Sequence, residues 1–145
     1  MRVGFYLAGT QPVERVLPLI ARAAKKAGQR MLVVAAEPDL LDRLDTALWE
    51  QFPEDFLAHG RADAAHAERQ PVLLSADCAA ANGATLVALA DGRWRDEAEQ
   101  FDRALLFFDE AGREAARETW RLFDQREDVT REFHELEGGK WVQKA

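Results

Sequence analysis

The apolar positions of this chain alternate between short unbroken runs and stretches with a helical period. Residues 3–7 and 31–36 are apolar runs of the length typical of buried strands. Between them, from Val13 to Ala27, apolar residues recur every three to four positions, which predicts an amphipathic helix that ends at Gly28. Pro18 lies inside this segment, so the helix either begins late enough to hold Pro18 in its first turn or is kinked there.

A second helix and several further strands are predicted after residue 36. The helix opens at Glu37-Pro38, carries its leucines on one face and ends near Trp49 to Phe52. Residues 53–70 are polar and predict an extended loop with at most one short strand. Three later apolar runs predict strands, with an Asn82-Gly83 turn between the first two, at 72–75, 85–90 and 104–108. The β-α-β-α opening favours a parallel sheet with right-handed crossovers.

The last clear helix is expected from Glu110 to about Gln125. Residues 126–145 have no strong period, and Phe133 and Trp141 are their candidates for docking onto the rest of the fold. The chain has the length of one compact domain. We therefore expect residues 1–145 to form a single α/β domain with a mostly parallel central sheet flanked by helices.

Charge and cysteine content narrow the range of functions. The net charge is −7 at pH 7, so the protein as a whole repels nucleic acid, and direct sequence-specific DNA binding is not expected. The lone cysteine, Cys78, cannot form an internal disulfide. No apolar run approaches the ~20 residues of a membrane span. We expect a cytoplasmic protein without membrane contact.

An α/β domain raises the question of a nucleotide site, but neither phosphate-binding fingerprint is present. A dinucleotide fingerprint, G-x-G-x-x-G, would follow the first strand, where residues 8–12 read A-G-T-Q-P with one glycine. The only Gly-Lys pair, Gly139-Lys140, precedes Trp141 near the end of the chain instead of a serine or threonine after an early strand. We expect no nucleotide-binding loop. The second interpretation is a small Rossmann-like nucleotide-binding enzyme that has lost its recognisable glycines.

Candidates for catalysis or metal binding are equally sparse. The only serine, Ser75, is not in a G-x-S-x-G elbow, and Cys78 lies among small residues, as a half-buried thiol would. His59, His66 and His134 have no spacing that would pair them as metal ligands. We therefore expect no catalytic site, no metal and no other cofactor.

The last helix carries the clearest candidate for a binding surface. On a helical wheel, the face expected to meet the core consists of Ala111, Ala115, Ala116, Thr119, Leu122 and Phe123. Arg113, Arg117 and Arg121 follow at four-residue intervals on another side, and Trp120 falls within this stripe. Guanidinium groups donate paired hydrogen bonds to carboxylates and stack on aromatic rings, so the stripe suits a peptide with acidic groups and an aromatic side chain. The alternative is a solvated helix whose arginines pair with its own acidic residues.

Three aromatic residues cluster where the second helix gives way to the loop: Trp49, Phe52 and Phe56. If they are exposed, they form an apolar patch of the kind that binds a partner protein. The alternative is that they close the edge of the core.

Several segments, in the same order along the chain, resemble the chi subunit of bacterial DNA polymerase III. Phe5-Tyr6-Leu7 resembles its F-Y-L opening, and residues 28–33 resemble its G-x-R-v-l-v second strand. Residues 44–49 resemble its L-D-x-x-L-W helix end. Residues 56–59 resemble its F-x-P-H stretch, with Ala58 where proline is usual. Weaker matches extend the resemblance over most of the chain, at 70–72, 101–103 and 116–117.

The resemblance implies a Rossmann-like fold without a nucleotide site and a non-catalytic, accessory role in the clamp-loader assembly during DNA replication. It implies that the acidic C-terminal tail of single-stranded DNA-binding protein (SSB) binds at Phe108, Arg113, Arg117, Trp120 and Arg121. It also implies contact with the psi subunit or the clamp loader through Leu48, Trp49, Phe52 and Phe56. Trp120 and Arg121 stand where the family has tyrosine and lysine, and Asp124 stands where a basic residue occurs.

Overall fold

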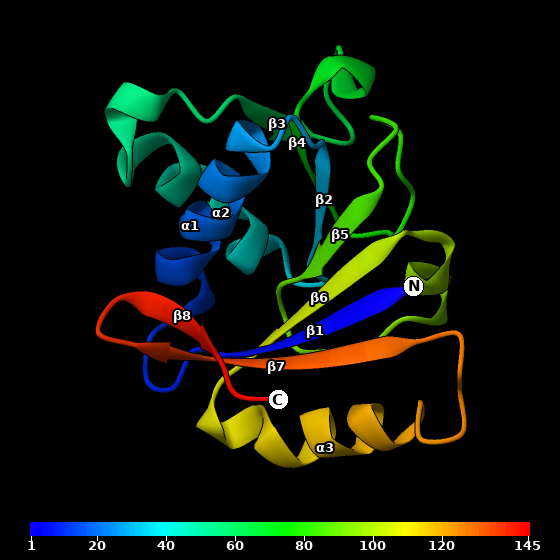
Figure 1. The fold of residues 1–145 in the computed structure, drawn as a ribbon. Coiled ribbons are helices and arrows are strands. Elements are labelled where there is room, and N and C mark those ends of the chain that lie inside the picture. The colour runs from blue at the N-terminus through cyan, green and yellow to red at the C-terminus, as the bar shows by residue number, and fades with distance from the viewer.

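The computed structural model describes all 145 residues and arranges the chain around one eight-stranded sheet (Figure 1). The strand order is β3-β4-β2-β5-β6-β1-β7-β8, and every neighbouring pair is parallel except β7 and β8. The strands are β1 (Arg2–Leu7), β2 (Met31–Val34), β3 (His59–Arg61), β4 (Val72–Ser75), β5 (Leu86–Leu89), β6 (Arg103–Phe108), β7 (Thr130–Glu137) and β8 (Lys140–Gln143). The helices are α1 (Val13–Lys26), α2 (Pro38–Glu50) and α3 (Arg113–Arg121), with four short 3₁₀ turns, η1 to η4, between elements. The predicted mostly parallel α/β fold is confirmed.

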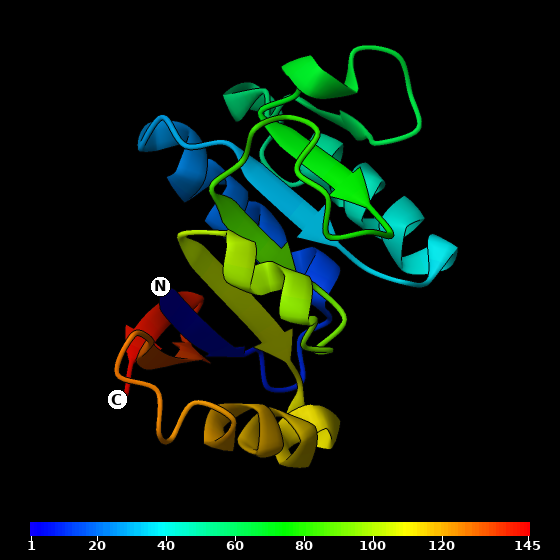
Figure 2. The same ribbon diagram turned by 90° about the vertical axis from the view of Figure 1, so that its right-hand side faces the viewer.

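The helices divide the core into two layers. The apolar faces of α1 and α2 pack against one side of the sheet, where they meet Met31 and Val33 of β2. The other side is covered by α3, through Ala116, and by the η3 turn (Asp96–Gln100), through Ala98. Because the central strands β2 and β5 are covered on both faces, all of their residues are buried, which explains their unbroken apolar sequences. Figure 2 shows α3 and the β7–β8 hairpin at one end of the sheet and the segment around β3 at the other.

Two local predictions are decided by the structure. Helix α1 begins at Val13, so the buried Pro18 lies beyond its first turn and leaves the carbonyl of Glu14 without its helical donor. The Asn82-Gly83 turn does not join a hairpin, because β4 and β5 lie on opposite sides of β2. Instead, the buried Asn82 amide donates hydrogen bonds to the carbonyls of Met31 (3.3 Å) and Gln70 (2.9 Å). The turn therefore links the start of β2 to the segment that leads into β4.

The C-terminal segment differs most from the prediction. Residues 130–143, which show no strong period, form the β7–β8 hairpin, and β7 pairs in parallel with β1 so that Tyr6 lies opposite His134. Trp141 and Phe133 pack against the two core layers from opposite faces of this hairpin. The sequence of β7 is rich in charge because most of its residues are only half-buried, so its apolar signal is weak.

Candidate functional site

Four of the five residues predicted to bind an acidic peptide meet around one hollow between α3 and β7. Phe108 ends β6, and Arg113, Arg117 and Trp120 lie on neighbouring turns of α3. The remaining walls are Phe5 of β1, Ala116 of α3 and Phe133 of β7. The hollow measures about 70 Å³, so it has room for one side chain but not for a nucleotide. Arg121 does not line it.

Trp120 is more deeply placed than the helical wheel predicted. It is half-buried, and its ring meets that of Phe5 edge-on, with centroids 5.0 Å apart. The guanidinium of Arg131, on β7, lies 4.7 Å from the centroid of the Trp120 ring. The prediction that Trp120 belongs to the arginine stripe and not to the core is therefore wrong in part, because the indole packs on the core while it lines the hollow.

The arginines of the stripe differ in their partners. Arg113 makes two hydrogen bonds to Glu110, at 2.9 and 3.0 Å, and Arg117 makes one to Glu114 at 2.7 Å. The hydrogen bond from Arg113 lowers the pKa of Glu110 below its ordinary value. Arg121 has no ion pair. Exposed pairs three residues apart are weak, so the carboxylates of an incoming peptide can replace Glu110 and Glu114.

The predicted core face of α3 is wrong at three positions. Leu122 is 60% exposed, and Ala111 and Ala115 are also exposed. The helix ends at Arg121, so Leu122 no longer follows the helical wheel. The residues of this segment that do pack inward are Ala116, Thr119 and Phe123.

A second candidate surface lies at the end of α2. Trp49 is 54% exposed and Phe56 is 74% exposed, whereas Phe52 is half-buried beneath the guanidinium of Arg22. Leu48 is fully buried against the sheet, so its inclusion in a partner surface is corrected: it faces the core and presents no side chain to a partner. We call Trp49, Phe52 and Phe56 the aromatic patch.

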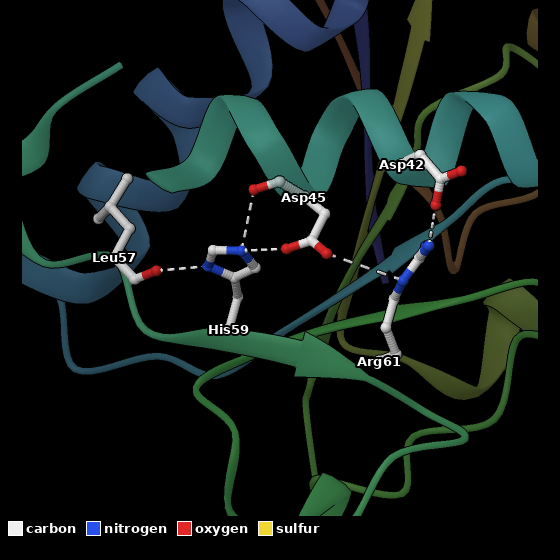
Figure 3. A network of polar contacts seen from close by, with 5 residues as sticks. All are labelled: Asp42, Asp45, Leu57, His59 and Arg61. Atoms are coloured by element: carbon white, nitrogen blue, oxygen red, sulfur yellow. Dashed lines mark hydrogen bonds and ion pairs between the residues drawn. The ribbon is translucent and has the colours of Figure 1, made fainter. Parts of the chain in front are cut away.

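Trp49 of the aromatic patch packs against a polar network that centres on the buried His59 (Figure 3). The ring of Trp49 lies 4.3 Å from that of His59, centroid to centroid. Nδ1 of His59 is 2.7 Å from the carbonyl oxygen of Leu57, and Nε2 is 2.6 Å from a carboxylate oxygen of Asp45. Arg61, two residues further along β3, pairs with Asp42 and Asp45 of α2. These contacts fix β3 to α2 and hold Trp49 on a rigid base.

Phe56 combines exposure with an unfavourable backbone. Its φ is +46°, in the left-handed region that bulky residues rarely adopt. Such a conformation costs about 1–3 kcal/mol, and residues that keep it gather at functional sites. An exposed phenylalanine in this conformation gains little from burial, which points to a role for its ring in binding.

Comparison with known protein families gives a match over most of the chain. The family model described as DNA polymerase III chi subunit, HolC, matches residues 1–129. The chain belongs to this family. A chi-family chain is an accessory subunit of DNA polymerase III, and its partners are found in the polymerase III complex. Comparison with curated proteins gives no match.

The family match stops before the hairpin that completes the hollow. Arg131 and Phe133 of β7 lie beyond residue 129 and were not predicted as site residues. The sequence held only a weak signal for them. Arg131 and Phe133 are two positions apart, so they face the same side of a strand. Only the pairing of β7 with β1 brings that side to α3. The predicted list of site residues thus described the helix side of the hollow and missed the strand side.

In this chi-family chain, a larger cleft of about 390 Å³ lies outside the carboxyl ends of β1 and β6. Open α/β sheets bind ligands at this position. Here the carboxylate of Asp91 accepts two hydrogen bonds from Arg95, at 2.8 and 2.9 Å, and one from the amide of Ala36. Burial opposes the ionisation of Asp91, but these bonds outweigh it and hold its pKa below the ordinary value. The Asp91 carboxylate therefore serves the fold itself. No group of three His, Cys, Asp or Glu residues could hold a metal ion, and no helix is long and apolar enough to cross a bilayer.

Proposed function

We propose that this chi-family subunit binds the acidic C-terminal tail of SSB in the hollow between α3 and β7. The observation that carries the proposal is one apolar hollow with two arginines at its edge: Phe108, Trp120 and Phe133 line it together with Arg113 and Arg117. The aromatic ring of the tail enters the hollow. Its terminal carboxylate and acidic side chains pair with the guanidinium groups, as in other acidic motifs that arginine clusters recognise.

The affinity expected from these contacts is modest. Hydrogen bonds to charged groups contribute about 1.5–3 kcal/mol each, and a short flexible peptide loses conformational freedom when it binds. We therefore expect a dissociation constant in the micromolar range, roughly −8 kcal/mol. The affinity should fall as salt is added, because the arginines are exposed and their interactions are screened.

Calorimetry with an SSB-tail peptide tests the site. Arg117→Ala should lower the affinity about tenfold or more, which corresponds to ~1.4 kcal/mol. Trp120→Ala should also weaken binding but leave its salt dependence almost unchanged, because no charge is removed. Arg43→Ala is the matched control, since Arg43 is an exposed, ion-paired arginine that does not line the hollow. Unaltered affinity in both Arg117→Ala and Trp120→Ala would place the tail site elsewhere. In parallel titrations we expect no saturable binding of ATP, NAD or single-stranded DNA.

The second part of the proposal is that the aromatic patch joins the subunit to psi or directly to the clamp loader. Exposed aromatic side chains on a rigid base are typical centres of protein interfaces, and Trp49 and Phe56 are the two most exposed aromatic residues here. Trp49→Ala and Phe56→Ala should each reduce co-purification with the clamp-loader assembly. Leu122→Ala is the control, because Leu122 is 60% exposed and directly follows α3, which lies at the other end of the sheet from β3. Equal recovery of all three variants would remove the aromatic patch from the interface.

A further inference from the structure

The β7–β8 hairpin lies beyond the residues that match the family, yet it supplies one wall of the hollow. We infer that Arg131 of this hairpin is a positioning residue of the peptide site, which fixes Trp120 in the wall of the hollow and neutralises Asp124 in the turn after α3. This inference rests on the proposed binding of an acidic, aromatic-ended peptide and assigns part of that site to a strand outside the family match.

Arg131 connects three groups of α3 and the turn after it. Its Nη1 donates to the carbonyl of Trp120 at 2.6 Å and to the carboxylate of Asp124 at 2.8 Å. The guanidinium also lies over the Trp120 ring, 4.7 Å from its centroid. Only 22% of the Arg131 side chain is exposed, so these contacts are partly shielded from water. Backbone, ring and carboxylate are thus held by one cation.

The position of Trp120 follows from these contacts. Phe5 meets the indole edge-on from β1, and Arg131 lies over it from β7. A ring held from two strands does not have to be ordered when the peptide arrives, and this preorganisation favours binding. A cation over an indole contributes about 0.5–2 kcal/mol, the larger value when the pair is desolvated. Without Arg131, Trp120 would keep only one of its two supports.

Arg131 also sets the charge in the turn after α3. Asp124 follows α3, and its carboxylate would repel an acidic peptide if it were unpaired. Arg131 compensates this negative charge. It donates both of these bonds through Nη1, and its Nε and Nη2 make no hydrogen bond of their own.

Titration of point variants with the tail peptide tests the inference. In Arg131→Ala we expect the affinity to fall about tenfold, and the indole N–H resonance of Trp120, assigned by Trp120→Phe, to shift in the free protein. Arg131→Lys keeps the charge but not the planar fork, so its affinity should lie between those of Arg131→Ala and the wild type. Arg126→Ala is the control, because Arg126 pairs with Glu99 and Asp128 and does not contact Trp120.

The variant Asp124→Asn distinguishes a role of Arg131 in peptide binding from a role in stabilising the fold alone. If Arg131 acts as inferred, this variant removes a negative charge next to Arg131, while the amide oxygen can still accept the hydrogen bond, so peptide affinity should rise several-fold. A fall in affinity would mean that the Asp124 pair only holds the fold, and the inference would be wrong. If the wild type binds the peptide and Arg131→Ala and Arg131→Lys bind it equally well, Arg131 has no part in the site although the proposed function stands. If the wild type does not bind, the proposed function itself fails.

Discussion

Phe56 shows how one residue can favour binding at the expense of stability. Its ring is exposed and its backbone is left-handed, so its contribution to the fold should be unfavourable. Asparagine adopts this conformation more readily, and we expect Phe56→Asn to raise the free energy of unfolding by about 1 kcal/mol. Phe56→Ala removes the same ring but keeps the strain, so its stability should stay near that of the wild type. Urea denaturation of the three proteins measures the difference. A loss of stability in Phe56→Asn would show that the ring packs usefully in the free protein.

His134 gives the fold a dependence on pH. It stacks on Tyr6 with centroids 4.4 Å apart, and its Nε2 is buried without a hydrogen-bond partner, 3.9 Å from a carboxylate oxygen of Glu132. Burial lowers the pKa of His134 below its ordinary value, although Glu132 partly opposes this. The unfolded chain therefore takes up the proton first as the pH falls, and the free energy of unfolding should decrease as pH falls through and below about 6.5.

The variant His134→Phe keeps a ring on Tyr6 and removes the proton site, so its unfolding free energy should change less between pH 7.5 and pH 5.5 than that of the wild type. His66→Asn is the control, because His66 is exposed and its left-handed backbone suits asparagine. Chemical denaturation at several pH values measures both. Parallel curves for His134→Phe and the wild type would show that another group is responsible.

At the scale of elements, the Asn82-Gly83 turn joins strands that are not neighbours. The Asn82 side chain is buried and satisfies the carbonyls of Met31 and Gln70. Asn82→Ala would leave these groups without their donor, and a buried polar group that loses its partner costs about 1–3 kcal/mol. Thermal denaturation should show this loss, with tail binding unchanged. Asp77→Ala, at an exposed position before the same turn, should stay within about 0.5 kcal/mol of the wild type.

The elements that the sequence predicted well are those with a strong local signal. Helices α1 and α2 follow a clear apolar period, and β2, β5 and β6 are unbroken apolar runs because both faces of the central sheet are covered. The β7–β8 hairpin was missed because its residues are charged and half-buried, and because its partner β1 is more than 120 residues away. The helix side of the hollow was predicted from α3 and β6, whereas Arg131 and Phe133 depend on that long-range pairing.

At the scale of the whole molecule, the two candidate surfaces lie at opposite ends of the sheet. The aromatic patch adjoins β3, the strand at one edge, and the hollow adjoins β7, six strand spacings away. With neighbouring strands about 4.8 Å apart, this separation is roughly 29 Å. The two surfaces therefore share no residue, and Figure 2 shows the elements that carry them at opposite ends of the sheet, so occupation of one leaves the other free.

We accordingly expect the SSB tail to bind with the same affinity whether or not the aromatic patch is occupied. Calorimetric titration of the tail into the free subunit and into its complex with the clamp-loader assembly should give dissociation constants within about twofold, or ~0.4 kcal/mol. Phe56→Ala is expected to leave tail affinity unchanged, and Arg117→Ala to leave clamp-loader association unchanged. A tenfold difference between free and assembled subunit would reveal coupling through the sheet.

Strand β1 lies in the interior of the sheet, and this position has a consequence for folding during synthesis. Its two neighbours are β6 and β7, and Arg2 at its start lies opposite Arg103 of β6 and Thr130 of β7. Strand β1 thus leaves the ribosome long before the two strands that flank it. At about 5–20 residues per second, synthesis of the intervening ~100 residues takes roughly 5–20 s. Throughout that time the apolar segment Phe5-Tyr6-Leu7 of the nascent chain is accessible to chaperones and to other nascent chains. We therefore expect ribosome-associated chaperones to bind this segment.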